Sequence, residues 1–434
     1  MSKSNTSNDT LTTAAIADMI TSTDHFAQDV GGLLYVYRGG VYRPCGEAHI
    51  RQQVKHLLCE QGREDEWESK LAGEVSEYIR ADAIELWEVP PPDLVNVQNG
   101  LLNVHNRELR PHSPEHLSSI QLPVTYDSAA VCLGWDLFVE ETFPDDSREV
   151  AYEIPAWAML PDTSIQKAVL LTGEGSNGKS AYLAGLCAFL GRRNVAGVNL
   201  HKLESDRFAA ARLMGKLANV CPDIPSTRLF GTSAFKALTG GDLLHGERKY
   251  RESFEFRSFA KLVFSANQPP FSDDSSYAFS RRWLVVPFTR TFEENAQDRQ
   301  KRSELDALLA DPYELSGLLN RALDALPRLH SKGFTTSDTL AGALKEFKEA
   351  TDPLTVWLNE HVDDEATAFI PKRELMVAYN SACTAAKRAP MNGTAFGLAL
   401  RRARPSLRDG QRTVAGKKTD VYLGIEWKRG CCVA

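Results

Sequence analysis

The stretch GEGSNGKS, residues 173–180, decides the fold of this chain. It fits the pattern GxxxxGK[ST], a loop whose glycines let successive backbone N–H groups face phosphate oxygens where a helix begins. The lysine of this pattern neutralises the β- and γ-phosphates of a nucleotide, and the final serine ligates Mg²⁺. We therefore expect ATP and Mg²⁺ to be bound by the residues of this loop: Gly173, Gly175, Ser176, Asn177, Gly178, Lys179 and Ser180.

Other glycine loops explain this stretch less well. Its first six residues also fit GxGxxG, but a dinucleotide-binding turn needs an acidic residue about 20 positions later. The sequence there is AGVNLH, residues 196–201, which contains no acid. A protein-kinase loop needs valine where Ser180 stands. A tight turn with a chance lysine is the remaining alternative, and the strand before and helix after the loop argue against it.

The segments around the loop alternate between strand and helix patterns. QKAVLLTG (166–173) reads as a buried strand, and the following helix ends at Gly191. Further strands are expected at 216–221, 261–266 and 283–288, and helices over 299–329. Alternation of this kind predicts an α/β core with a largely parallel sheet.

Two polar residues follow the expected strands next to the loop. Asp223 in KLANVCPDIP comes 44 residues after Lys179 (223 − 179). We expect it to hold the metal or orient water, the alternative being a simple loop aspartate. Pro222 and Ile224 flank it, so no second acid stands beside it, and Asp242 or Glu247 is a candidate for that second carboxylate. Asn267 ends LVFSAN, where an amide can hydrogen-bond both a γ-phosphate and a water.

Positive charge is concentrated at two further places in the core. A cationic group made of His245, Arg248, Lys249 and Arg251 follows a Gly-Gly break at a predicted hairpin, although basic hairpin tips are also common on ordinary surfaces. Arg281 and Arg282 precede the apolar run WLVVPF, and the alternative here is a solvated strand end. Arginine is always charged and presents a fork of donors that suits phosphate.

The ends of the chain differ from the core. Residues 1–22 are rich in Ser, Thr and Asn and are expected to be a disordered tail, followed by an α+β accessory domain over 23–148. This domain has hairpins at 33–44 and 94–104. The core is assigned to 149–330, and 331–353 is assigned to a linker, a polar connection with one charged helix. The accessory domain shows no paired-aspartate metal site on a strand, so primase activity is not expected.

The C-terminal domain, residues 354–434, is predicted to be a winged helix, because three helical segments precede a hairpin at 414–429. Between 372 and 429 it has 13 Lys and Arg against 4 Asp and Glu, a net charge of +9. Such a cluster favours DNA through counterion release, although acidic partner proteins are an alternative. The residues expected to contact DNA include Arg401, Arg402, Lys417 and Lys418.

Bulk properties set limits on these hypotheses. The 434 residues suffice for two or three domains, and 43% hydrophobic with 25% charged residues is ordinary for a globular protein. The net charge is −7, so nucleic acid must be bound by local basic clusters. Eight scattered cysteines without metal-binding spacing read as reduced thiols. No signal peptide or membrane span is found, and a cytoplasmic protein is expected.

The order of these motifs carries a family resemblance. GEGSNGKS, KLANVCPDIP, FKALTGGD with ERK, LVFSANQPP and SRRWLVVPF together resemble superfamily three helicases. The likeness is to the phage and plasmid primase–helicase group related to the poxvirus uncoating/primase ATPase. It runs from about 94 to 290, and VQNGLLNV (97–104) and LPVTYD (122–127) look like that family's accessory domain.

The resemblance implies an AAA+-like ATPase that forms a hexameric ring and translocates on single-stranded DNA. Lys179 and Ser180 then belong to Walker A, Asp223 to Walker B, and Asn267 is sensor one. The hairpin near Arg248 and Lys249 would grip DNA in the channel. One of the paired arginines resembles an arginine finger that reaches the neighbouring subunit, and Arg282 is preferred.

The sequence therefore predicts an ATP-dependent DNA helicase of phage or mobile-element replication, acting in a bacterial host cytoplasm on single-stranded or forked DNA. A separate primase or replication protein is a possible partner under this prediction. The main alternative is an ATP-gated initiator or loader that binds DNA without processive unwinding. A weaker alternative is a nucleotide-gated scaffold that acts on protein.

Overall fold

A computed structural model of the protein describes residues 11–428, apart from short gaps. The gaps are residues 226, 228, 230, 250, 251, 269, 271, 273, 275, 293–295, 387 and 388, and only the backbone is described for 296–302. Four basic residues counted in the sequence, Arg251, Lys387, Arg388 and Arg429, lie outside the described residues. Among the described residues, no helix has both the length and the apolar character needed to cross a bilayer.

The central sheet has five parallel strands in the order β14-β8-β13-β10-β9, as expected for an α/β core. The strands are β8 (Ala168–Thr172), β9 (Val195–Ala196), β10 (Ala218–Cys221), β13 (Lys261–Ala266) and β14 (Trp283–Pro287). All the strands expected from the apolar runs in this region are confirmed. Each is short, and most residues of β8, β10, β13 and β14 are apolar and buried, because a parallel sheet is covered on both faces.

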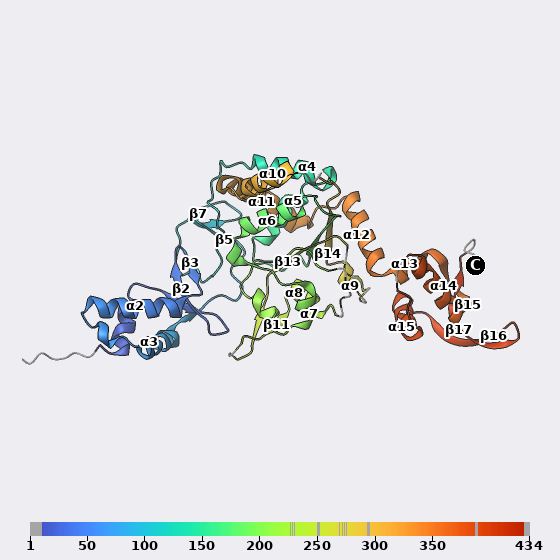
Figure 1. The fold of residues 1–434 in the computed structure, drawn as a ribbon, viewed down its shortest axis with the longest axis horizontal. Coiled ribbons are helices and arrows are strands. Elements are labelled where there is room, and N and C mark those ends of the chain that lie inside the picture. Colours follow the sequence, from blue (N-terminus) through green and yellow to red (C-terminus); the bar gives the residue numbers. More distant parts are fainter. Residues whose placement is uncertain are drawn as a thin grey trace, which may run out of the picture.

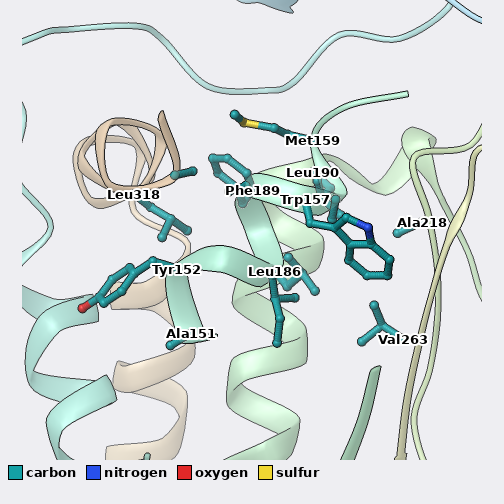
Figure 2. Packing of buried hydrophobic residues seen from close by; sticks show 14 of the residues in the cluster. Ala151, Tyr152, Trp157, Met159, Leu186, Phe189, Leu190, Ala218, Val263 and Leu318 are labelled. Carbon is teal, nitrogen blue, oxygen red and sulfur yellow. The ribbon is translucent and has the colours of Figure 1, made fainter. Parts of the chain in front are cut away.

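Alternate strand residues enter two separate cores. Val169 and Leu171 of β8 belong to one buried cluster, while Ala168 and Leu170 belong to another. The first cluster is formed with α4 (Leu133–Thr142), α5 (Val150–Ala158), α6 (Lys179–Leu190) and α11 (Pro312–Lys332). Figure 2 shows Trp157 and Leu186 of this cluster facing Val263. Burying each large apolar side chain stabilises the fold by about 1.5–3 kcal/mol.

The opposite face of the sheet is covered by shorter elements. They are α7 (Leu200–Ser205), α8 (Ser233–Gly240), α9 (Tyr277–Ser280) and α12 (Asp338–Thr351). Helix α12 is the one charged helix expected in the segment assigned to a linker, and it packs against the core. Phe347 of α12 is buried and lies 5.4 Å from the Trp283 ring, because the helix has an apolar stripe that needs a partner.

The helical stretch expected over 299–329 is divided in two. Helix α10 (Ala296–Leu309) ends before α11, which begins at Pro312. Asp311 caps α11 by accepting from the backbone N–H groups of Tyr313 and Glu314. The Asp-Pro pair explains the break, since aspartate favours the N-cap and proline favours the first helical position.

Residues 13–21 form a helix where a frayed tail was expected. The prediction of disorder over residues 1–22 is wrong for α1 (Thr13–Thr21), which buries Ile16 and Ile20 and packs against α3 (Ser69–Asp82). Residues 1–10 lie outside the described part. The prediction followed the polar composition of this segment and overlooked Ile16 and Ile20. These two apolar residues, four positions apart, suffice for one short amphipathic helix.

Both expected hairpins of this part are present. The remaining helix is α2 (Gly46–Glu60), and β1 (Phe26–Gln28), β2 (Leu34–Arg38), β3 (Val41–Arg43) and β4 (Ile84–Glu85) form one sheet. A second sheet contains β5 (Leu94–Val97), β6 (Gly100–Asn103) and β7 (Leu109–Arg110). The β2–β3 turn uses Gly39 and Gly40, both with positive φ.

The C-terminal part lies at the other end of the molecule from α1–α3 (Figure 1). It contains the three expected helices, α13 (Pro353–His361), α14 (Lys372–Ala385) and α15 (Gly393–Ala403). The hairpin consists of β16 (Arg408–Val414) and β17 (Lys417–Trp427), and it starts earlier than expected. An additional strand, β15 (Val362–Pro371), pairs with β17.

Candidate nucleotide-binding site

The glycine loop, residues 173–180, connects the end of β8 to the start of α6. Gly173, Gly175 and Gly178 have φ values of 151°, 119° and 90°, which side-chain-bearing residues rarely adopt. A Cβ on Gly173 would lie 2.1 Å from Asn177 Nδ2. The loop therefore requires glycine for both conformation and space, and it forms a cradle that a methyl group would obstruct.

Lys179 is the first residue of α6, and its side chain turns back into the loop. Its Nζ donates to the Gly173 carbonyl at 2.7 Å and to Asn177 Oδ1 at 3.1 Å. The residue is 5% exposed, and this burial lowers the pKa of its ammonium, an effect that the nearby Asp223 carboxylate opposes. The lysine charge is thus concentrated at the centre of the cradle.

Asp223 follows β10 in a conformation that tertiary contacts hold. Its φ is 52°, and its backbone N–H donates to Ser265 Oγ at 3.2 Å. The next residue, Ile224, donates its N–H to the Ser265 carbonyl at 2.9 Å. Ser265 was not singled out in the sequence, where its position in an apolar strand gave no signal. It fixes the backbone that directs the Asp223 carboxylate.

The predicted site residues meet at one edge of the sheet. Strand β13 lies between β8 and β10 and runs parallel to both, so their carboxyl ends lie together. The glycine loop follows β8, Asp223 follows β10 and Asn267 follows β13. Ligands of open α/β sheets bind at this carboxyl edge. Ser180 and Asn267 are exposed there, so both are available to a ligand.

Neither candidate for a second carboxylate belongs to this edge. Glu247 pairs with Arg207 at 3.2 Å, and Asp242 lies near Arg282, where its charge partly offsets the lowering of the Arg282 pKa by burial and by Arg281. Within the described part of the chain, no contact joins either acid to the glycine loop. The expectation that one of them accompanies Asp223 therefore has no structural support.

The paired arginines lie at the opposite edge of the same sheet. They precede β14, which runs parallel to β8, and the Arg282 carbonyl accepts from Ala168 N–H at 2.7 Å where β8 begins. Strand β8 has five residues, so at about 3.3 Å per residue the two edges are about 17 Å apart. Neither arginine can reach the glycine loop of its own chain without a large rearrangement.

The two arginines differ in exposure. Arg282 is 9% exposed, its Nη1 donates to the Ala278 carbonyl at 2.5 Å, and its Nε has no hydrogen-bond partner among the described residues. Arg281 is partly exposed, and its Nη2 donates to Gln166 Oε1 at 2.7 Å. The preference for Arg282 as the residue that reaches outward is therefore not supported by its burial.

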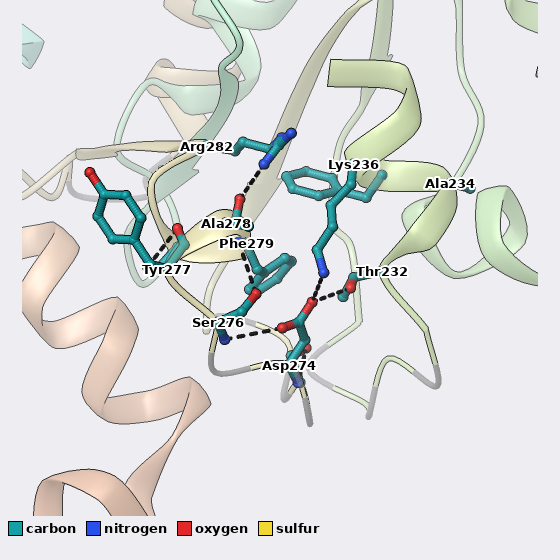
Figure 3. Close-up of polar contacts among 12 residues, drawn as sticks. Thr232, Ala234, Lys236, Asp274, Ser276, Tyr277, Ala278, Phe279 and Arg282 are labelled. Carbon is teal, nitrogen blue, oxygen red and sulfur yellow. Dashed lines mark hydrogen bonds and ion pairs between the residues drawn. The ribbon is translucent and has the colours of Figure 1, made fainter. Parts of the chain in front are cut away.

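A polar cluster holds the helix that leads to the arginines (Figure 3). Asp274 accepts from Lys236 Nζ at 2.5 Å, from Thr232 Oγ1 and from Ser276 N–H at 3.0 Å. Burial raises the pKa of Asp274, but these hydrogen bonds outweigh burial and hold the pKa at about 2. The cluster joins α8 to α9, whose C-cap is Arg281.

The predicted basic hairpin is present, but one of its cations is engaged. Strands β11 (Leu243–Gly246) and β12 (Phe254–Arg257) are antiparallel. Arg248 in the loop between them forms two hydrogen bonds with Asp29 of the N-terminal part, at 3.2 and 3.0 Å. Its guanidinium also lies 4.9 Å from the Phe254 ring centroid. Arg248, which the sequence predicts as a DNA contact, is thus engaged by Asp29 in this structure, while His245 and Lys249 are exposed.

Burial and further hydrogen bonds position the Asp29 carboxylate for its contact with Arg248. Asp29 is 7% exposed, and its carboxylate also accepts from the backbone N–H groups of Gly31 and Leu33 and from the Tyr35 hydroxyl. Burial, followed by the charge of Asp29, raises the pKa of Tyr35. Asp29 is 219 residues from Arg248 in sequence, so no local pattern could have identified the pair.

Some of the C-terminal basic residues are paired with an acid, and others are exposed. Arg401 pairs with Asp409, which Lys372 also contacts at 2.7 Å. Lys417 and Lys418 are exposed at the start of β17, beside the hairpin turn. The glycine loop, Asp223 and Asn267 thus lie at one edge of the central sheet, whereas the C-terminal cations lie in a separate part of the chain.

Comparison with known families matches two segments of this chain. Residues 14–144 match a family described as D5 N terminal like, and residues 171–282 match a family of unknown function, DUF5906. A putative helicase of Acanthamoeba polyphaga mimivirus is 24% identical over 220 residues. That alignment covers 48% of this chain and 23% of the viral protein, so the chain spans less than a quarter of its relative.

Solved structures resemble the chain over nearly its whole length. The apo structure of the NrS-1 C-terminal region (305–718) aligns with a TM-score of 0.52 and 12% identity, covering 95% of this chain and 98% of the other. An A-form apo structure of the same region aligns with a TM-score of 0.49. At 12% identity, the match to the 305–718 structure shows a shared fold only. It includes the N-terminal part, the central sheet and the C-terminal part of the chain.

Proposed function

We propose that this chain is an ATP-dependent DNA helicase of replication that works as a ring of identical subunits. The proposal rests chiefly on the separation between the glycine loop and the paired arginines at opposite edges of one sheet. Such a protein needs a second copy to bring arginine to the phosphates. The D5-like N-terminal match and the helicase-named viral relative support the same class.

The carboxyl edge has the donors and acceptors that a magnesium nucleotide requires. The cradle formed by Gly173 and Gly178 offers backbone N–H groups, and the buried Lys179 offers a cation. Ser180 and Asp223 would ligate Mg²⁺, which supplies charge neutralisation on the phosphates when bound. Asn267 would hydrogen-bond the terminal phosphate and a water. We assign the arginine finger to Arg281, because it is the more exposed of the pair.

DNA contacts are proposed at the β11–β12 hairpin and in the C-terminal part. The exposed His245 and Lys249 mark the hairpin, and Lys417 and Lys418 mark the turn that would serve as the wing of a winged helix. These contacts would be made to phosphates, so binding should weaken as salt rises. The absence of primase activity stays a prediction.

Forked DNA tests this function against its main alternative. We expect the purified protein to displace a strand from a fork with continuous ATP turnover, and Lys179→Ala protein to displace none. An initiator or loader would instead separate DNA in proportion to the protein added, with no further product as ATP is consumed. Product formed per subunit, measured together with phosphate release, discriminates between them.

Replacing Asp29 should free a DNA contact. Asn retains the acceptor for Gly31 and Leu33 but loses the charge that holds Arg248, so Asp29→Asn is expected to raise affinity for single-stranded DNA about fivefold. Fluorescence anisotropy with a labelled oligonucleotide measures the change, and the exposed Asp82→Asn is the matched control. If Asp29→Asn and the unmodified protein bind single-stranded DNA with equal affinity, Arg248 does not contact DNA.

A further inference from the structure

Helix α4 carries an outward face of mixed apolar and acidic character. Leu133 and Leu137 are 64% and 63% exposed, one helical turn apart. Glu140 and Glu141 continue the same face, since residues three and four positions apart are neighbours on a helix. Both glutamates are exposed, and among the described residues no side chain pairs with either carboxylate. Two exposed leucines and two unpaired carboxylates thus share one face of α4.

The C-terminal end of α4 lies beside the glycine loop. A Cβ on Gly178 would meet Thr142 Cγ2 at 2.9 Å and the Phe138 ring at 3.4 Å, both on the inner side of α4. Arg290, which follows β14 on the same side of the sheet, donates to the Glu141 carbonyl at 3.0 Å. The C-terminal end of α4, which carries Glu140 and Glu141, therefore lies next to the nucleotide site proposed above.

The edge of the sheet that carries Arg281 and Arg282, here called the arginine edge, is cationic and so complements the acidic face of α4. Tyr277 of α9 is 78% exposed and one turn before Arg281. Lys167 Nζ donates to the Arg281 carbonyl at 2.6 Å, and the charges of Arg281 and Lys348 add to burial in lowering the pKa of Lys167. Three cations and an exposed aromatic ring therefore gather at this edge, with Lys348 exposed on α12.

The two surfaces lie at different edges of the core. In Figure 1, α4 and α10 lie at the top of the core and α9 lies lower, while the N- and C-terminal parts flank the core on either side. Surfaces that are complementary but occupy different places on one molecule make a head-to-tail contact, which repeats around a ring. Opposite charges on them favour that contact over like-to-like pairing.

We propose that the outer face of α4 (Leu133, Leu137, Glu140 and Glu141) docks on the cationic edge (Lys167, Tyr277, Arg281 and Lys348) of a second copy of this chain. The inference rests on the proposed function and specifies how the partner copy is seated. Docking there brings the arginine edge of one chain beside the glycine loop of the next. The leucines lose their exposure, and the glutamates gain cationic partners.

Charge reversal tests the contact without altering the nucleotide site. Glu140→Lys/Glu141→Lys places like charges across the contact, so the protein concentration for half-assembly with ATP and single-stranded DNA should rise about tenfold. Lys348→Glu should weaken assembly in the same direction. Mixing the two variants restores complementary faces at alternate contacts, so the mixture should assemble better than either variant alone. Sedimentation velocity measures all three.

A matched control carries the same charge change elsewhere. Glu64→Lys/Asp65→Lys alters two exposed acids of the N-terminal part and should leave assembly unchanged. Unimpaired assembly of the α4 variant, or a mixture no better than its components, would overturn the docking. If the unmodified protein instead stays monomeric at full ATP turnover, the shared-site helicase itself is wrong, and the docking fails with it.

Discussion

Replacing Lys179 by alanine is expected to abolish ATP turnover, with a fall in rate of at least about 100-fold. The Lys179 ammonium is buried, and it is held inside the loop by Gly173 and Asn177. Alanine leaves the backbone cradle but removes its only cation among the described residues. Phosphate release by the purified variant, with single-stranded DNA present, measures the effect.

Two controls separate chemistry from folding in this experiment. Lys202→Ala removes an exposed lysine from α7 in the same core and should retain normal turnover. The thermal unfolding midpoint of Lys179→Ala should stay close to that of the unmodified protein, because the hydrogen bonds it loses lie within one loop. If a folded Lys179→Ala protein hydrolyses ATP at the normal rate, the glycine loop is not the site that binds the phosphates.

Local patterns predicted the central sheet because its strands are short, apolar and separated by clear turn residues. Strand β15 escaped notice for the opposite reason. Its sequence VDDEATAFIP is mostly exposed, and it is held by pairing with β17 instead of by burial of its own side chains. Hydrophobic alternation cannot identify a strand of this kind.

Contacts between distant segments could not be derived from the sequence. The pairing of Arg248 with Asp29 depends on how the N-terminal part sits against the hairpin, and nothing in the sequence around Asp29 marks it as the partner of that cationic group. The burial of Arg282 similarly depends on α9, and the segment before α9 is tied to α8 by the contact of Asp274 with Lys236. By contrast, the glycine loop could be recognised because its chemistry requires consecutive residues.

Subunit mixing should restore activity lost in two separate variants. Arg281→Ala protein retains Lys179 but cannot complete a neighbour's site, and Lys179→Ala protein has the reverse defect. We expect each alone to be nearly inactive, because the arginine edge and the glycine loop of one chain lie about 17 Å apart. In a random equal mixture, about a quarter of contacts join an intact lysine to an intact arginine, so turnover should recover to about that fraction.

The second arginine provides the internal comparison for this prediction. Arg282 is buried and bonded to the Ala278 carbonyl, so Arg282→Ala is expected to lower the unfolding temperature and to be rescued less by Lys179→Ala protein. Arg281→Ala should unfold normally, since its Gln166 contact is partly exposed. Rescue of Arg282→Ala but not of Arg281→Ala would reverse the assignment of the finger. If neither mixture recovers while both variants fold and assemble, each site is complete within one chain, and arginine from a neighbour has no part in hydrolysis.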